Sequence, residues 1–403
     1  MNEFLILLKF EYKKIFKKKS TGISLLLLLI ITLAIGMTGI QGYSYVDGKK
    51  ATSHYDDMVT DRAYEKALSG RSLDKELILE TQQAYRHINP DTRFTLTEEY
   101  QLYARPYSVI RGIILEVYSP GKTMDIERLL NLKQEEAKNF YELRNAQLLT
   151  ELEGLNLSKA EINKHLRLNA QVKTPFTFEY SGGYKNFLLS AFPIGLFVVF
   201  STAICLAPVF AGEYTSNTAP IILSSKHRNM ETAAKLVTGI TFSISMSIIY
   251  LSVTLLECCC IYGFGGAGAP VQLLNVLMSY PLTMLNSCGL LILCNAAVNL
   301  LVAGITLLLS SRLKSPFGVI ILVSLLLFAP LFIKVSENIR SLYDLVHMLP
   351  SNMLDINVVF GRHMYHFLAS PVLPYLYISL FCIVLSCCLM LFTFRSFHKH
   401  QMI

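Results

Sequence analysis

The chain has 403 residues, of which 52% are hydrophobic and only 16% are charged. Because soluble globular proteins carry about 25% charged residues, this composition excludes an ordinary soluble domain and indicates a chain largely embedded in lipid. The formal net charge is +7. No basic stripe interleaved with aromatic residues and no zinc-finger spacing accompanies it, so we expect no nucleic-acid partner.

The charged residues are unevenly distributed along the chain. Residues 41–185 contain 21 of the 29 acidic and 20 of the 36 basic residues, so this stretch is almost neutral. The basic excess therefore lies beside the apolar runs, where it sets the orientation of membrane helices. Residues 41–185 are predicted to face water, and the rest of the chain is predicted to lie mostly in the membrane.

Residues 1–20 are predicted to form an amphipathic helix that lies in the cytoplasmic membrane interface. The alternative is a plain basic flank of the first span, which would need the charge but not the periodicity. Apolar residues at helical spacing form one face of this helix and lysines form the other: Phe4, Leu8, Tyr12 and Ile15 against Lys9, Lys13 and Lys17.

Six apolar runs approach the length of about 20 residues that a membrane-spanning helix requires. The first of them, in residues 21–40, has no clear cleavage site after it, so we interpret it as a retained anchor rather than a signal peptide. The fold class is therefore an all-α polytopic membrane protein with six transmembrane helices. The runs are Gly22–Ile40, Phe187–Pro208, Leu236–Ile261, Leu290–Ser310, Phe317–Ile333 and Tyr375–Phe394.

Basic residues in the short flanks and loops predict the orientation of these spans, because they concentrate on the cytoplasmic side. With six spans, both termini lie in the cytoplasm. The other side has only Lys334, Arg340 and Arg362 in its short loops. The cytoplasmic side has Lys9, Lys13, Lys14, Lys17, Lys18, Lys19, Lys226, Arg228, Lys235, Arg312, Lys314, Arg395 and Lys399.

Residues 41–185 then form a large extracytoplasmic domain between spans 1 and 2, and about 145 residues suffice for a core of their own. We expect it to be mainly helical, with a capping box of Ser158 and Glu161 opening its last helix. The outer loop Lys334–Pro374 is too long for a simple turn, and short helices would explain it. The helices predicted in the domain are Asp57–Leu68, Asp74–His87, Asp125–Leu152 and Ser158–Asn169.

Residues 186–403 carry spans 2–6 and, at 209–235, a cytoplasmic loop that is too long for a tight hairpin. The acid Glu213 stands at the exit of span 2, and a short apolar piece, Ala219–Leu223, precedes a polar turn. A short helix with an apolar face is suited to docking into a groove on a soluble partner. We also expect Glu213 to have a basic or hydrogen-bonding partner, either in that protein or on the N-terminal helix.

A family resemblance rests on the order of these features. A basic interfacial helix, a span, a large loop and a span that ends in Glu213 are followed by a short helix containing Thr218. The turn Ser225-Lys226-His227-Arg228 and then Lys235 open the next span. This pattern resembles the type-2 permeases of bacterial ATP-binding-cassette (ABC) transporters. The family often has Gly-Thr where this chain has Asn217-Thr218, and Pro220 is unusual in the short helix.

The resemblance implies a plasma-membrane protein that works as a homo- or heterodimer of permeases with two ABC ATPase subunits. ATP and Mg²⁺ would be bound by the ATPase, and this chain would need no cofactor. The resemblance also favours export. The residues implied at the ATPase-coupling interface are Glu213, Tyr214, Thr218, Ile221, Ile222, Lys226 and Arg228.

Enzyme chemistry is not expected in the chain itself. It has no Gly-x-x-x-x-Gly-Lys-Ser/Thr phosphate loop, no His-Glu-x-x-His and no Gly-x-Ser-x-Gly. His363 and His366 lie three residues apart, and Cys258-Cys259-Cys260 form a run, but neither has a full set of metal ligands at the usual spacing. All nine cysteines lie in or beside apolar runs, so we expect free thiols and no structural disulfide.

Polar residues within the spans are candidates for a substrate path. Glu257 lies near the outer end of span 3, and Asn295 and Asn299 share one face of span 4. The alternative for the two asparagines is hydrogen bonding between helices. Because the spans have few charges, an amphipathic or hydrophobic cargo, such as a peptide, drug or lipid-like molecule, is expected. The rival hypotheses are a membrane-bound sensor that uses residues 41–185 without transport, and a membrane-embedded enzyme.

Overall fold

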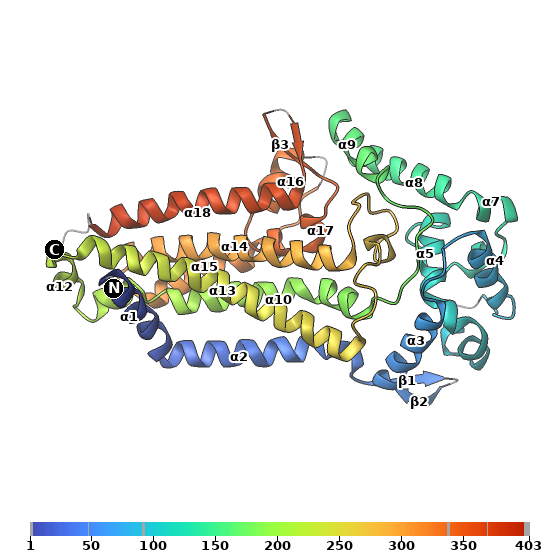
Figure 1. Ribbon diagram of the computed structural model, residues 1–403, viewed down its shortest axis with the longest axis horizontal. Coiled ribbons are helices and arrows are strands. Elements are labelled where there is room, and N and C mark those ends of the chain that lie inside the picture. Colours follow the sequence, from blue (N-terminus) through green and yellow to red (C-terminus); the bar gives the residue numbers. More distant parts are fainter. Residues whose placement is uncertain (1–2, 47, 91–92, 337–338, 369, 399–403) are drawn as a thin grey trace. The chain divides into compact units, whose positions relative to one another are not determined.

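The computed structural model describes residues 3–46, 48–90, 93–336, 339–368 and 370–398, and these are mostly helical, with two small β-hairpins (Figure 1). Contacts divide the chain into two compact units. The bundle unit consists of Met1–Ile35, Leu189–Thr254 and Gly289–Ile403. The insert unit consists of Gly36–Leu188 and Leu255–Cys288.

Within the described part of the chain, five helices are long and apolar enough to cross a membrane, as expected of an integral membrane protein. Each contains a long run of apolar side chains, and the single interior proline among them, Pro193, does not interrupt its helix. The five helices are α2 (Lys19–Gly36), α10 (Gly182–Leu206, continued by short turns to Thr215), α13 (Arg228–Tyr262), α14 (Met284–Arg312) and α18 (Pro374–His398).

The fifth predicted span corresponds to a shorter helix, α15, which runs from Pro316 to Phe328 and continues as the 3-10 turn η6 (Ala329–Phe332). The Ser315 side chain caps its start by accepting the Gly318 N–H, and Pro330 ends the α-helical geometry because it has no N–H to donate. The segment is shorter than the other five, so a sixth crossing stays a prediction.

The core of the bundle unit lies between α10, α14, α15 and α18. α10 and α14 are mostly buried, whereas α2, α13 and α18 expose most of their surface. This exposed surface is apolar: Leu26, Ile249 and Leu391 are each more than half exposed. Such a surface is suited to contact with lipid chains. Core residues include Val199, Ala203, Val298, Val302, Val319, Val323, Ile378 and Cys382.

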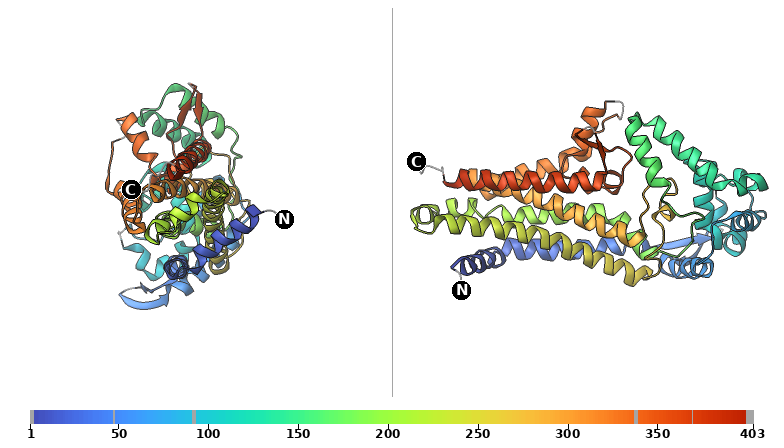
Figure 2. Two further views of the ribbon diagram at one scale, coloured as in Figure 1. Left: turned by 90° about the vertical axis from the view of Figure 1, so that its left-hand side faces the viewer. Right: turned by 45° about the horizontal axis from the view of Figure 1, so that its top comes forward.

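Helix α1 (Glu3–Lys17), helix α12 (Ala219–Ser224) and the C-terminal end of α18 lie at the same end of the bundle unit (Figures 1 and 2). The Arg312 side chain donates to the Ser396 hydroxyl over 3.3 Å, and the rings of Phe210 and Phe397 are 4.8 Å apart. Lys399 lies outside the described residues. The remaining bundle elements are α11 (Ala211–Thr215), α16 (Arg340–His347), η7 (Asn352–Leu354), α17 (Ile356–Val359), β3 (Tyr365–Phe367) and β4 (Ser370–Val372).

The insert unit is mainly helical, as predicted. Its hairpin pairs β1 with β2 antiparallel, with Tyr45 opposite Lys50. The capping box at Ser158 is confirmed: the Ser158 hydroxyl accepts the Glu161 N–H, and the Glu161 carboxylate accepts the Ser158 N–H. The elements are β1 (Tyr43–Val46), β2 (Lys49–Ser53), α3 (His54–Leu68), α4 (Lys75–Ala84), η3 (Tyr100–Ala104), η4 (Arg105–Tyr107), α5 (Ser108–Tyr118), α6 (Ile126–Leu130), α7 (Gln134–Lys138), α8 (Phe140–Gly154) and α9 (Lys159–Asn169).

The prediction of one continuous helix over Asp125–Leu152 is wrong. The structure has three helices there, α6, α7 and α8. Asn131 ends α6, and the Glu136 carboxylate accepts the Lys133 N–H at the start of α7, which fixes the break. An ion pair of 2.7 Å from Arg128 to Glu136 spans the break. Local capping therefore overrides the apolar periodicity on which the prediction was based.

Residues 255–288 belong to the insert unit, although they are far in the sequence from its other residues and no sequence pattern predicts their membership. Arg144 of α8 is 1% exposed and donates through Nε to the Val276 carbonyl over 2.7 Å and through Nη2 to the Met278 carbonyl over 3.0 Å. His165 of α9 hydrogen-bonds Ser279 Oγ over 2.7 Å. Two helices of the stretch 41–185 thus hold the loop after α13.

Candidate functional site: a buried charge cluster beneath helix α12

Local sequence turns Glu213 toward the protein interior. Helix α10 ends at Leu206, and the Ser310 hydroxyl of α14 accepts the N–H groups of Phe210 and Ala211 while donating to the Ala207 carbonyl. These bonds satisfy backbone groups between α10 and α11 that would otherwise be orphaned. As a result α11 starts a new turn, and Glu213 on it is only 7% exposed.

Glu213 belongs to a cluster of buried charges from three elements. Lys235 of α13, which is 0% exposed, places Nζ 2.5 Å from Glu213 Oε1 and 2.8 Å from Glu11 Oε1. Lys14 of α1 places Nζ 2.8 Å from Glu11 and 3.1 Å from Glu213. Burial opposes the charge of Lys14, but the hydrogen bonds and negative charges of Glu11 and Glu213 outweigh burial and raise the pKa of Lys14 above its usual range.

A third carboxylate completes the cluster. Glu231 Oε1 lies 3.8 Å from Lys235 Nζ, and oxygens of Glu11, Glu213 and Glu231 lie within 4.8 Å of one another. Three carboxylates at this spacing could hold a metal ion. The Lys235 ammonium, however, is within 3.8 Å of all three, so this lysine supplies the positive charge that a cation would otherwise bring.

The cluster ties α1, α11 and α13 together. A buried ion cluster is costly to break, because each group that remains after the loss of its partner is an uncompensated buried charge. Displacement of α11 should therefore move α13 and α1 with it. A partner for Glu213 on the N-terminal helix was one of the two expectations from the sequence, and Lys14 is that partner.

The residues expected at the coupling interface fall into two groups. Glu213 and Ile222 are buried, and Tyr214 is half-buried with its hydroxyl donating to the Ser311 carbonyl, so these three brace the loop from within. A contact of Glu213 with a partner protein stays a prediction. The exposed residues, with Ile221 at 70%, are Thr218, Ile221, Lys226 and Arg228.

Helix α1 presents a different face to the outside from the one predicted. Ile15 is buried and Phe4, Leu8 and Tyr12 are half-buried against the bundle, with the Tyr12 hydroxyl 2.6 Å from Thr241 Oγ1. The predicted lipid face is therefore a protein-facing one. The outward surface mixes lysines with apolar side chains: Lys9, Lys13 and Lys17 with Leu5, Ile6, Phe10 and Phe16.

Asn295 and Asn299 form hydrogen bonds between helices inside the bundle unit. Asn299, 0% exposed, donates to Thr202 Oγ1, the Ser243 carbonyl and Ser247 Oγ over 2.8–3.1 Å. Ser247 in turn donates to Asn295 Oδ1 over 3.0 Å. These are the bonds that the alternative, hydrogen bonding between helices, predicts. A role of the two asparagines in a substrate path stays a prediction.

Replacing Asn299 with alanine should lower the free energy of unfolding by about 1–2 kcal/mol, because contacts from α10 and α13 to α14 are lost together. Thermal unfolding of the detergent-solubilised protein measures this. Asn286→Ala is the matched control, since Asn286 is on the same helix but exposed. An equal and small effect of both substitutions would contradict the structural role of Asn299.

Glu257 belongs to the insert unit, whereas Asn295 and Asn299 belong to the bundle unit. Its carboxylate packs directly on Gly36, where an added Cβ would be 2.5 Å from the carboxylate oxygen. Its Oε2 is buried without a hydrogen-bond partner among the described residues. A larger residue at position 36 would therefore have to displace the Glu257 carboxylate, and no ion pair joins that carboxylate to another described residue.

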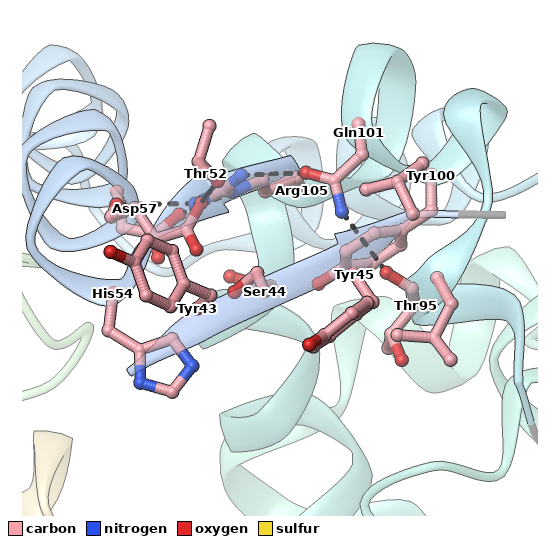
Figure 3. Close-up of a pocket in the computed structure, with 14 residues that line it drawn as sticks. Tyr43, Ser44, Tyr45, Thr52, His54, Asp57, Thr95, Tyr100, Gln101 and Arg105 are labelled. Carbon is pink, nitrogen blue, oxygen red and sulfur yellow. Dashed lines mark hydrogen bonds and ion pairs between the residues drawn. The ribbon is translucent and has the colours of Figure 1, made fainter. Parts of the chain in front are cut away.

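The insert unit has a cavity of about 540 Å³ bounded by β1, α3 and the turns before α5 (Figure 3). Tyr43, Tyr45 and Tyr100 contribute rings to its wall. Arg105 crosses it and donates to Asp57 over 2.9 Å and to Gln101 over 2.6 Å. These charges are already paired with one another, so what remains for a ligand is mainly aromatic and hydrogen-bonding surface.

A second cavity of the insert unit, about 230 Å³, is bounded by α3, the start of α10 and the end of α13. Burial raises the pKa of Glu65 in its wall to about 7, against the opposing effect of the Lys185 charge. No ion pair joins Glu65 or Lys185 to another described residue.

The two histidines of the loop before α18 have different surroundings. His363 accepts a hydrogen bond from Arg340 over 2.7 Å and packs on Tyr343, whereas His366 is exposed. All nine cysteines are free thiols.

Comparison with known proteins gives no relative: no protein-family model, no curated protein and no solved structure matches this chain.

Proposed function

We propose that the chain is the membrane-spanning permease subunit of an ABC transporter. The observation that carries the proposal is the largely buried cluster of Lys235, Glu213, Glu11 and Lys14, which links α11 to α1 and α13. The exposed helix α12 follows α11 directly, and the Thr218 N–H at its start donates to the Glu213 carbonyl over 3.0 Å. A push on α12 by a soluble ATPase would pass through α11 into α13 and α1. Rigid elements joined by buried ion pairs transmit such a displacement without a long pathway.

The topology of this proposal has six crossings and two cytoplasmic termini in a bacterial plasma membrane. The sixth crossing is Pro316–Phe332, whose 17 residues reach about 25 Å as a helix, a little short of a hydrocarbon core of about 30 Å. Local thinning of the bilayer accommodates a short span. The lysines at the α1 and α12 end of the bundle support placing that end in the cytoplasm.

The proposed complex contains two permease chains and two ATPase chains, and the ATPases bind ATP and Mg²⁺. The cargo of the proposal is amphipathic or hydrophobic, and its direction is export. The polar side chains buried in the bundle, such as Asn295 and Asn299, are engaged with other helices, which supports a path that lacks charged groups.

The test is pull-down of the ATPase encoded beside this chain together with transport in vesicles. Ile221→Asp and Arg228→Glu should reduce ATPase binding at least tenfold, because an introduced or reversed charge would be buried at the docking surface. The control is Leu102→Asp, which alters an equally exposed apolar residue, also 70% exposed, in the insert unit. Unchanged binding and transport in both coupling variants would overturn the proposal.

The second candidate function is a sensor that binds a ligand through the insert unit without transport. The cavity of about 540 Å³ with three tyrosines favours it, because ligand sites combine aromatic walls with a few polar groups. A purified complex with an ABC ATPase supports the permease. Association with a histidine kinase, and with no ATPase, supports the sensor.

A further inference from the structure

A cavity of about 450 Å³ opens beside the charge cluster in the bundle unit. Its wall is built by the end of α1, the linker to α2, and the segment from α10 to α12. The apolar part of the wall includes Ile15, Cys205, Pro208 and Val209. The charged part consists of Glu11, Glu213, Lys14, Lys17 and Lys18.

The charges of this wall do not cancel. Glu11 and Glu213 are both neutralised within the cluster, by Lys14 and by the neighbouring Lys235. Lys17 and Lys18 have no ion pair with any residue in the described part of the chain. With Glu231 also counted beside Lys235, the cavity and its charge cluster have an excess of about one positive charge, which lies at Lys17 and Lys18.

The position of Lys18 shows that its charge is available to a ligand. Its ammonium donates to the Pro208 carbonyl over 3.3 Å, near the C-terminal end of α10. Burial lowers the pKa of Lys18, and the charges of Lys14 and Lys235 lower it as well. The opposing effect of Glu213 and Glu11 does not fully compensate for the lost water. An anion in the cavity would supply that compensation.

The outer surface of α1 indicates which kind of anion can arrive. Phe10 and Phe16 are more than half exposed next to the lysines, so this helix has the composition of a segment that lies in a membrane interface. A ligand that reaches the cavity from that interface has an anionic head and an apolar body. The lysines of the cavity can bind the anionic head, and Ile15, Pro208 and Val209 can contact the apolar body.

We propose that this cavity binds an anionic phospholipid, with Lys17 and Lys18 on the phosphate and the glycerol-proximal chain against Pro208 and Val209. The bound lipid would brace α1 against α11 beside the charge cluster. The inference goes beyond the proposed function and does not depend on it, since it requires only that the chain lies in a bilayer. Basic pockets between membrane helices on the cytoplasmic side are a recurring site for anionic headgroups.

Native mass spectrometry of the full-length protein, exchanged into phosphatidylglycerol or phosphatidylcholine, tests the site. The wild type should keep one phosphatidylglycerol per chain and lose phosphatidylcholine. Lys17→Gln with Lys18→Gln should weaken phosphatidylglycerol binding by about 30-fold, because each lysine near an anionic headgroup contributes about fivefold. Val209→Phe should also weaken it by filling the apolar part, although every lysine is retained.

The matched control is Lys9→Gln with Lys13→Gln, which removes two charges from exposed positions of α1 that do not line the cavity. This variant should bind phosphatidylglycerol within about twofold of the wild type. Equal losses in both double variants would reduce the effect to general surface charge and overturn the site. Retention of phosphatidylcholine, or full displacement of the lipid by millimolar inorganic phosphate, would also overturn it. Thermal unfolding of each variant checks that it is folded.

Discussion

Replacing Lys235 with methionine should lower the free energy of unfolding by about 3–5 kcal/mol, the cost of removing one partner from a buried ion cluster. Lys235 is 0% exposed and contacts Glu11, Glu213 and Glu231. Without it, three acids at close range would have only Lys14 as a partner, and like charges would repel one another. Thermal or denaturant unfolding of the solubilised protein measures the loss.

A second substitution tests whether uncompensated charge causes the loss of stability in Lys235→Met. Lys235→Met combined with Glu213→Gln removes one charge of each sign, so the double variant should recover a large part of the lost stability, as replacement of a buried pair by neutral groups is often tolerated. Lys226→Met, at an exposed position in the same loop, should change stability by less than about 0.5 kcal/mol. If the double variant is as unstable as the sum of its single variants, electrostatic coupling is not what holds α1, α11 and α13 together.

The long membrane helices could be predicted from the sequence, because a run of about 20 apolar residues has few structural alternatives. All five of the longest helices follow predicted runs. The fifth predicted run, Phe317–Ile333, forms a shorter helix for a local reason. Pro316 and Pro330 delimit it, and the helix between them ends at Phe328. A hydropathy pattern records composition and not where a proline ends the hydrogen-bond ladder.

The charge cluster was only partly predictable. The position of Glu213 at the end of a span signalled a buried acid in need of a partner. Glu11, which shares Lys235 with it, is 224 residues from that lysine in the chain and lies in a basic helix where one acid carries no distinctive signal. Pairings over such separations depend on the tertiary fold, and no local spacing reveals them.

In the insert unit, the predicted helix Asp125–Leu152 assigns side chains to the wrong face. A single helix over Asp125–Leu152 would place Leu143 in its apolar stripe. Because the chain breaks at Asn131 and again before Phe140, Leu143 is 38% exposed and the adjacent Arg144 is buried. A buried arginine has no sequence signature of its own. Its acceptors, the carbonyls of Val276 and Met278, belong to a loop more than 130 residues away.

Replacing Arg144 with methionine should lower the free energy of unfolding of the full chain by about 2–4 kcal/mol. The substitution leaves the Val276 carbonyl without the donor that Nε provides and removes one of the donors to Met278, and each buried acceptor left unsatisfied costs about 1–3 kcal/mol. It also removes the guanidinium stacked 5.3 Å from the Phe176 ring centroid. Hydrogen exchange should show lost protection over residues 271–280, while helices of the bundle unit stay protected.

The variant Arg144→Lys tests whether the planar shape of the guanidinium or only its positive charge stabilises the loop. A lysine keeps the positive charge but has no planar fork, so it cannot serve Val276, Met278 and Asn169 at once, and most of the stability should still be lost. Arg128→Met is the control, since its ion pair with Glu136 is about one-third exposed and should contribute less than about 1 kcal/mol. Unchanged exchange over 271–280 in Arg144→Met would show that this loop is held by His165 and Gln272 instead, because both also bond to residues of that loop.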